Sequence, residues 1–454
     1  EARHIAEGVA QWSIKALGAS LAEAGPYVVN PSHRPRSGVV ELMVVGDDLD
    51  LSGAQVLSET VGFPGRSTLD ADTVRTVLGM LQGPKIENDT WIQMVSLRED
   101  DEGLHLTLTL GPDEVPDVPI AEIKQDLYTA LGARPDALVH LAFDQPTTRR
   151  ILARTDLVPG FGWKPFVPAP LANPASADEA SVVSLGNGLV NVELDGSDGT
   201  FSVDGIAGFG RLVDVGDHGD SYNYSPPAND HIVDAPSSVE VEVTERGPVR
   251  ASALIRATYL IPDHIDEDSR TRVGEVPLVV TTEISVLADD PVVRVATSFI
   301  NPARDHRLRV HLPLLRPADH SLAECAFDLV SRGLEAEGRS DERGLPTFPS
   351  RRFVAAGGLT VVHEGINEYE LVDVVDGEAH ALALTLVRST GMLSRLGMTY
   401  RPFPAGPLTP VEGLQLVGRT ITSRYAISME SRNPYEIADD VLPPLETLAA
   451  TGGG

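Results

Sequence analysis

Between residues 182 and 430, apolar and polar side chains alternate along many long segments, and this pattern constrains the fold more than any other feature. Two examples are SSVEVEVTERGPVRASALIRATYLI and VPLVVTTEISVLADDPVVRVATSFIN, which contain turn signals such as Arg-Gly-Pro and Asp-Asp-Pro. An alternation with period two buries one face of a strand, and strands joined by short turns pair antiparallel. The pattern therefore predicts a mainly β chain with a large antiparallel β-sandwich over residues 182–430.

The residues before this region predict a smaller β-domain, residues 26–165, with an α+β insertion at about 70–155. In the insertion, DADTVRTVLGML and PIAEIKQDLYTALG have helical spacing, whereas TWIQMVSLRED, LHLTLTLG and ALVHLAF read as strands. Residues 166–181 are rich in Pro, Ala and Ser and predict a linker. We expect residues 431–454 to form a truncated tail without a closing strand.

Residues 1–25 predict one amphipathic helix. Apolar side chains recur at close to helical spacing, at Ile5, Val9, Trp12, Leu17 and Leu21. A single helix of this kind has an apolar face that needs partners to cover it. Because a β-pattern follows directly, we expect those partners to precede residue 1.

The charge of the chain argues against nucleic-acid and membrane partners. Lys and Arg number 36 and Asp and Glu 66, which gives a formal net charge of −30. Neutralising phosphates takes clustered basic side chains, and no apolar run is long enough to span a bilayer. The chain has one cysteine, Cys325, which we interpret as a small core residue rather than a nucleophile. One cysteine excludes an internal disulfide, and a cytoplasmic location fits best.

Local motifs for catalysis and metal binding are missing from the sequence. The histidines never form the H-x-H, H-x-x-x-H or H-E-x-x-H spacings of metal sites. His306 and His311 are five residues apart on a predicted strand, so we expect them to face opposite sides. No G-x-S-x-G elbow and no P-loop occur. The sequence thus predicts no catalytic residue, metal ligand or cofactor in this chain, although ligands from distant segments stay open.

The stretch GDSYNYSPPAND, residues 219–230, is the candidate sugar-binding loop. Binding a sugar takes aromatic rings together with hydrogen-bonding groups, and this loop supplies both in Asp220, Tyr222, Asn223, Tyr224, Asn229 and Asp230. The alternative is a polar connection whose tyrosines pack on the sandwich. The simplest interpretation of the arginines in VRSTGMLSR, residues 387–395, is that they form ion pairs at the surface.

Several motifs in order resemble the C-terminal half of glycoside hydrolase family 38, the α-mannosidases, particularly bacterial members of the mannosylglycerate-hydrolase and cytosolic type. They run from about residue 26 to 430: VVNPSHRPRSGVVEL, VPGFGWKPF, GDSYNYSPP, NPARDHRLRVHLP, FPSRRFV, GLTVVHEGINEYELV, LTLVRSTGMLSR, RPFPAGP and GRTITSRYAI. The resemblance implies a mutarotase-like super-sandwich for the large β-region. It also implies retaining hydrolysis of α-mannosides, with zinc holding hydroxyls of the sugar.

The resemblance places zinc and the nucleophile outside this chain. No position matches the family's His-x-Asp zinc pair, nucleophile Asp or zinc His, so we expect them in a missing N-terminal catalytic domain, with residues 1–25 as the last helix of a three-helix bundle. For this fragment the resemblance implies a substrate rim of Tyr222 and Arg388, with Asp220 able to orient either one. It also implies an α-mannoside or oligosaccharide substrate and a possible homo-oligomer.

Two other functions stay open. One is a freestanding carbohydrate-binding module without hydrolase activity. The other is a different sandwich-fold enzyme that processes sugars with its own carboxylates, which would require two acidic side chains to converge in a cleft.

Overall fold

The structure of the chain, a computed structural model, describes residues 2–46, 50–80, 83–86, 90–101, 103–111, 115, 118–339 and 342–450. The chain folds into two compact units. The first comprises Glu1–Tyr27, Val40–Ala153 and Thr447–Gly454, and the second Val28–Val39 and Arg154–Glu446. Within the described residues, no helix has the length and apolar character needed to cross a membrane. The finer domain limits given above stay predictions.

The first unit contains both helices and strands. Its elements are α1 (Ala2–Ser20), β3 (Gln55–Thr60), β4 (Phe63–Leu69), α2 (Ala71–Met80), β5 (Trp91–Asp100), β6 (Gly103–Gly111), α3 (Ile120–Ala133) and β7 (Val139–Gln145). Four further strands belong partly to each unit: β1 (Gly25–Asn30), β2 (Arg36–Val45), β8 (Thr148–Val158) and β31 (Glu446–Ala450).

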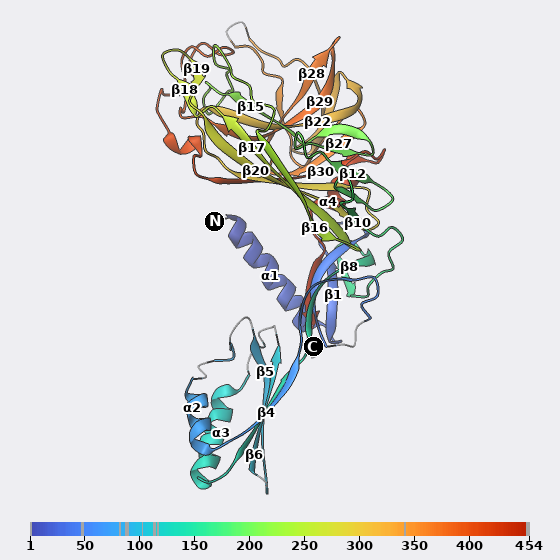
Figure 1. Ribbon diagram of the computed structural model, residues 1–454, viewed down its shortest axis with the longest axis vertical. Coiled ribbons are helices and arrows are strands. Elements are labelled where there is room, and N and C mark those ends of the chain that lie inside the picture. Colours follow the sequence, from blue (N-terminus) through green and yellow to red (C-terminus); the bar gives the residue numbers. More distant parts are fainter. Residues whose placement is uncertain are drawn as a thin grey trace. The chain divides into compact units, whose positions relative to one another are not determined.

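The α+β insertion has its own sheet and its own core. Its strands lie in the order β4-β7-β6-β5, with β6 and β7 parallel, and helices α2 and α3 lie on one side of them (Figure 1). Leu127 and Leu131 of α3 are fully buried in a cluster with Ile92 and Leu104 of the sheet. The helices and strands predicted for this segment are confirmed.

The second unit is almost entirely β-structure. Its strands are β9 (Gly162–Pro165), β10 (Ser176–Asp178), β11 (Ser184–Gly186), β12 (Asn191–Leu194), β13 (Phe201–Val203), β14 (Ile206–Phe209), β15 (Arg211–Gly216), β16 (Ser238–Arg246), β17 (Arg250–Ile261), β18 (His264–Asp266), β19 (Thr271–Val273), β20 (Val276–Leu287), β21 (Val293–Ile300), β22 (His306–Ala318), β23 (His320–Cys325), β24 (Asp328–Gly333), β25 (Thr347–Pro349), β26 (Phe353–Ala356), β27 (Leu359–Glu364), β28 (Glu368–Val375), β29 (Glu378–Ser389) and β30 (Thr420–Ser428). A 3₁₀ helix η1 (Glu412–Gln415) and helix α4 (Pro434–Val441) complete it.

Three sheets of the second unit share one hydrophobic core. Their strand orders are β10-β11-β12-β13-β14, β15-β22-β29-β28-β25 and β16-β17-β20-β21-β30-β27-β26-β23-β24. Phe201, Val310 and Ile255, one from each sheet, belong to the same buried cluster. Along β21, and along β17 from Ala253 onward, the buried residues alternate, as the period-two pattern requires. The predicted fold class, mainly β and antiparallel, is confirmed.

Two local predictions are wrong, and a third stays a prediction. Residues 431–450 contain α4 and β31, but β31 belongs to none of the three sandwich sheets, so the expected lack of a closing strand in the sandwich stays a prediction. The segment predicted as a linker contains β10, which pairs with β11. Cys325 is not a core residue: it is half-buried at the end of β23, where the hairpin turn leaves its side chain partly open to solvent.

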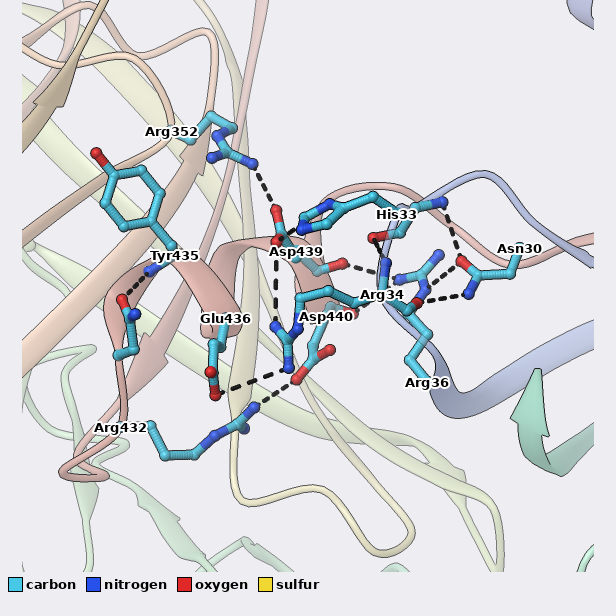
Figure 2. Close-up of polar contacts among 12 residues, drawn as sticks. Asn30, His33, Arg34, Arg36, Arg352, Arg432, Tyr435, Glu436, Asp439 and Asp440 are labelled. Atoms are coloured by element: carbon cyan, nitrogen blue, oxygen red, sulfur yellow. Dashed lines mark hydrogen bonds and ion pairs between the residues drawn. The ribbon is translucent and has the colours of Figure 1, made fainter. Parts of the chain in front are cut away.

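Helix α4 is fastened to residues 28–39 by a buried arginine (Figure 2). Arg36 is 5% exposed, and its Nη1 donates to the carbonyl oxygens of Asp439 at 3.1 Å and Asp440 at 3.3 Å. Carbonyl groups in the last turn of a helix have no partner within the helix, so a guanidinium there caps it. At the other end, the side chain of Asn433 accepts from the backbone N–H of Tyr435.

Two buried histidines make the stability of the second unit depend on pH. Burial lowers the pKa of His311 on β22 to about 3, with Arg309 adding to the effect, and burial lowers the pKa of His363 on β27 to about 4. In the unfolded chain a histidine titrates near pH 6.5, so between that pH and about 4 the unfolded chain binds protons that the folded chain excludes. We expect each histidine to remove about 3 kcal/mol of unfolding free energy at pH 4 relative to pH 7.

The expected loss can be measured by urea unfolding, followed by circular dichroism, across this pH range. His363→Gln should flatten the pH dependence, whereas His320→Gln, at an exposed position, should leave it unchanged. An equal slope in wild type and His363→Gln would contradict the assignment.

Candidate functional site

The loop at residues 217–230, between β15 and β16, is built around the buried carboxylate of Asp217. Its Oδ1 accepts the backbone N–H groups of Gly219 at 2.9 Å and Ser225 at 3.2 Å. Its Oδ2 accepts Nε of Arg388, on β29, at 2.7 Å. A Cβ at Gly219 would lie 2.2 Å from the carbonyl oxygen of Asn223, so a side chain at this position would break the turn.

Asp220, three residues further on, organises the tip of the loop. Its carboxylate is fully buried and accepts the N–H groups of Tyr222 and Asn223, both at 3.0 Å, and that of Arg395 at 2.8 Å. The guanidinium of Arg401 completes its partners. Burial acts to raise the pKa of Asp220, but these N–H groups and Arg401 outweigh it, so the pKa lies below its usual value.

Hydrogen bonds to both Asp217 and Asp220 fix the position of Arg388. Besides its ion pair with Asp217, its Nη2 donates to the backbone oxygen of Asp220 at 3.1 Å. Burial acts to lower the pKa of Arg388, and the charge of Asp217 outweighs it, so the pKa is raised and the guanidinium stays charged. The arginine is therefore a preorganised donor rather than a mobile surface side chain.

The loop forms one wall of an open hollow of about 520 Å³. Tyr222, Asn223 and Tyr224 line it, together with Arg388 and Glu368 at the ends of β29 and β28. The segment after β24 also lines it, with Glu337, Arg339, Glu342 and Arg343. Tyr222 is 54% exposed, and Gly406 leaves room for its hydroxyl, because a Cβ there would lie 3.3 Å from that oxygen.

Strand β22 carries two buried arginines, Arg307 and Arg309, one of which contacts Tyr224 of the loop. The guanidinium carbon of Arg307 lies 3.7 Å from the ring centre of Tyr224, a cation–π contact. Arg309, two residues on, donates to Glu370 at 2.8 Å, and Glu368 accepts from Thr385 at 2.7 Å. Burial raises the pKa of Tyr224 to about 12, so its hydroxyl stays protonated.

The structure brings some of the candidate residues together and separates others. Tyr222, Asn223, Tyr224 and Arg388 line the same hollow, with Asp220 behind them. Asn229 is exposed and does not line it, and the Asp230 carboxylate instead accepts the N–H of Gly216 at 3.0 Å. The place of Asp220, Tyr222 and Arg388 at a substrate rim stays a prediction.

His306 and His311 have different environments, in keeping with their predicted opposite directions. His306 is fully buried between Asp214, 2.5 Å from its Nδ1, and Asn301, 2.8 Å from its Nε2. His311 instead contacts Arg211 at 3.2 Å. In the described part of the chain, no group of three or more His, Cys, Asp or Glu side chains could hold a metal ion.

Sequence reasoning missed Asp217, Arg395 and Arg401 as partners of the loop, and it missed Arg307 and Glu368. A period-two alternation along HRLRVHLP puts Arg307 and Arg309 on one face of a strand, a point that the sequence analysis did not use. Nothing in the sequence shows that this polar face is buried or that Tyr224 covers it.

Comparisons with known proteins agree with the predicted resemblance. No known family profile matches the chain. It is 24% identical over 252 residues to a "Putative mannosylglycerate hydrolase" from Halalkalibacterium halodurans, which covers 49% of this chain and 27% of that protein. An α-mannosidase from Enterococcus faecalis V583 superposes with a TM-score of 0.57 at 18% identity, over 96% of this chain and 47% of that one. A glycosyl hydrolase family 38 protein from Enterococcus faecalis superposes equally well, at 17% identity and over 48% of its chain.

These findings confirm the predicted resemblance to the family and the fold class. The chain shares the fold of part of those proteins, and it spans about a quarter of the sequence relative and about half of each solved structure.

The hydrogen bonds of Asp220 predict the effect of neutralising it. In Asp220→Asn, Arg401 loses its buried charge partner, and an amide NH₂ group would face an N–H donor. We expect the unfolding free energy to fall by about 3 kcal/mol. Urea unfolding measures the change, with Asp376→Asn, at an exposed turn position, as the control. A loss below about 1 kcal/mol would show that the loop does not depend on this carboxylate.

Proposed function

We propose, from the fold that the chain shares with family 38 enzymes, that it is the β-rich portion of a retaining α-mannosidase that hydrolyses terminal α-mannosides. In this proposal the fragment supplies scaffold and one rim of the active site. The observation that carries it is the hollow, which both Tyr222 and Arg388, the rim residues implied by the resemblance, line. Their convergence from distant segments supports a common ligand.

The chemistry of the hollow suits a sugar. The exposed ring of Tyr222 offers an apolar face and its hydroxyl a hydrogen bond, which is how aromatic side chains commonly meet polar ligands with apolar faces. Arg388 offers N–H donors that its ion pair with Asp217 has already oriented. Glu368 offers carboxylate oxygens that accept from hydroxyl groups.

The proposed parent enzyme needs a zinc site and a nucleophile, which this proposal places outside the chain. Zinc and an aspartate nucleophile would come from an N-terminal catalytic domain, and zinc bound there would polarise hydroxyls of the sugar. Helix α1 supports such a domain, because Ile5, Val9 and Trp12 are exposed on it and suit burial against the other helices of a bundle. We also propose a cytoplasmic location, in keeping with the lone, half-buried Cys325.

A freestanding carbohydrate-binding module is the alternative function, and the hollow would serve it as well. The two functions differ in what this chain does alone. A rim that lacks its catalytic domain encloses only one side of a sugar, so we expect it to bind mannosides too weakly for a module. A module would bind them unaided.

The first test is hydrolysis of an aryl α-mannoside by the 454-residue chain, with zinc added and with a chelator. We expect no turnover in either condition, together with weak binding of methyl α-mannoside in ligand-observed NMR. Zinc-dependent turnover would contradict the fragment assignment. Tight binding without turnover would favour the module.

The second test uses the proposed parent enzyme together with its catalytic domain. We expect Tyr222→Phe to lower kcat/KM about tenfold through the lost hydroxyl contact, and Tyr222→Ala to lower it about a hundredfold. Tyr128→Phe, on the exposed side of α3, is the matched control and should leave kcat/KM unchanged. If Tyr222→Ala keeps full activity, the hollow is not part of the active site.

A further inference from the structure

Strand β24 forms an open edge of the nine-stranded sheet. It pairs with β23 along six residues, from Asp328 to Gly333, and no segment in the described part of the chain pairs with its outer side. At the other end of this sheet, β16 is in contact with β10. An unpaired edge strand presents backbone donors and acceptors that can pair with another chain.

Phe327, at the tip of the β23–β24 hairpin, is likewise not covered by any of the described residues. Its side chain is completely exposed, at 103% of the reference area, and its φ of 69° lies in the left-handed region. That backbone conformation costs a bulky residue about 1 kcal/mol or more. No packing within the described residues offsets this cost, which is unusual for a large aromatic side chain.

Two charged residues of β24 have no ion-pair partner among the residues that the structure describes. Among the described residues, neither Asp328 nor Arg332 forms an ion pair, although Arg332 is half-buried and lies 5.4 Å from the ring centre of Phe348. The Nε atom of Arg332 is buried without a hydrogen bond in the described part of the structure. A nearby carboxylate would therefore be favourable.

We propose that the outer edge of β24 binds a second copy of this chain, antiparallel, with a two-fold axis through Val330. Such an axis keeps the faces of both sheets aligned, so residues equally far from Val330 lie opposite one another. Val330 then faces the partner's Val330, and Asp328 faces the partner's Arg332. Phe327 faces the partner's Gly333, whose missing side chain leaves room for the ring.

In this register the two residues of each of these pairs complement each other. The two-fold axis produces the pair of Asp328 with Arg332 and the pair of Phe327 with Gly333 twice, and the pair of two Val330 residues once. Directly opposite charges and apolar pairs each contribute about 0.2–1 kcal/mol between antiparallel strands, and an aromatic ring over a glycine on a sheet edge is a further stabilising pair. The pair of Leu329 with the partner's Ser331 is the one that adds no stabilisation. A contact limited to one strand per copy is small, so we expect a dissociation constant on the order of micromolar.

Charges on an edge strand can also serve the opposite purpose, because they prevent pairing with other chains. The two interpretations differ in outcome: a guarded edge leaves the chain monomeric, whereas a paired edge gives a dimer. The two interpretations also predict different results when one copy carries two positive charges at positions 328 and 332 and the other copy carries two negative ones.

Sedimentation velocity of the chain from about 1 to 100 µM is the test. We expect a dimer whose proportion rises with concentration. Asp328→Arg alone and Arg332→Asp alone each place like charges opposite one another and should sediment as monomers. Mixed in equal amounts, the two variants present opposite charges at every such pair and should again form a dimer.

Two further variants keep the test independent of folding defects. Val330→Lys places two like charges on the axis and should be monomeric even if Arg332→Asp fails to fold. Glu378→Arg, an equally exposed position away from this edge, should remain dimeric. A wild-type chain that stays monomeric at 100 µM would overturn the proposal. So would dimers that persist in Asp328→Arg and Val330→Lys, because another surface would then join the copies.

Discussion

The buried ion pair between Asp217 and Arg388 is the interaction on which the candidate site depends. It joins a loop to a central strand of a sheet, and it fixes the position of the arginine that faces the hollow. Burying a carboxylate without partners would be very unfavourable. The carboxylate of Asp217 therefore also needs the hydrogen bonds that it accepts from the N–H groups of Gly219 and Ser225. Removing the charge of Arg388 would leave the carboxylate of Asp217 buried without its ion-pair partner.

Asp220 extends this arrangement to the tip of the loop. Because its carboxylate accepts the N–H groups of Tyr222 and Asn223, the backbone at Tyr222 is fixed while the ring stays exposed. Arg307 contacts the ring of Tyr224. Buried charge networks of this kind add little net stability, but they specify a single arrangement of side chains. A rigid loop that presents an exposed ring loses little freedom on binding, which favours recognition of a ligand.

Much of the fold could be predicted from local patterns, because alternation along a strand and spacing along a helix are properties of the sequence itself. The strands β17, β20 and β21 and the helices α2 and α3 were found in this way. Strand β31 was not, because the five residues of ETLAA carry no clear alternation and acquire their strand geometry from pairing. Within the site, the motif around Tyr222 singled out the loop, but it left open whether the two tyrosines pack inward or face solvent.

The sequence by itself determined the mainly β fold class, the α+β insertion and the loop whose composition suits a sugar, because these depend on neighbouring residues. Only the tertiary structure decided which charges meet. Asp217 and Arg388 are far apart along the chain, and no local pattern identifies either as the partner of the other. The same holds for Tyr222 and Tyr224, one exposed and one covering Arg307. Long-range pairing of strands brings these groups together, and the high cost of burying an unpaired charge then selects the arrangement that pairs them.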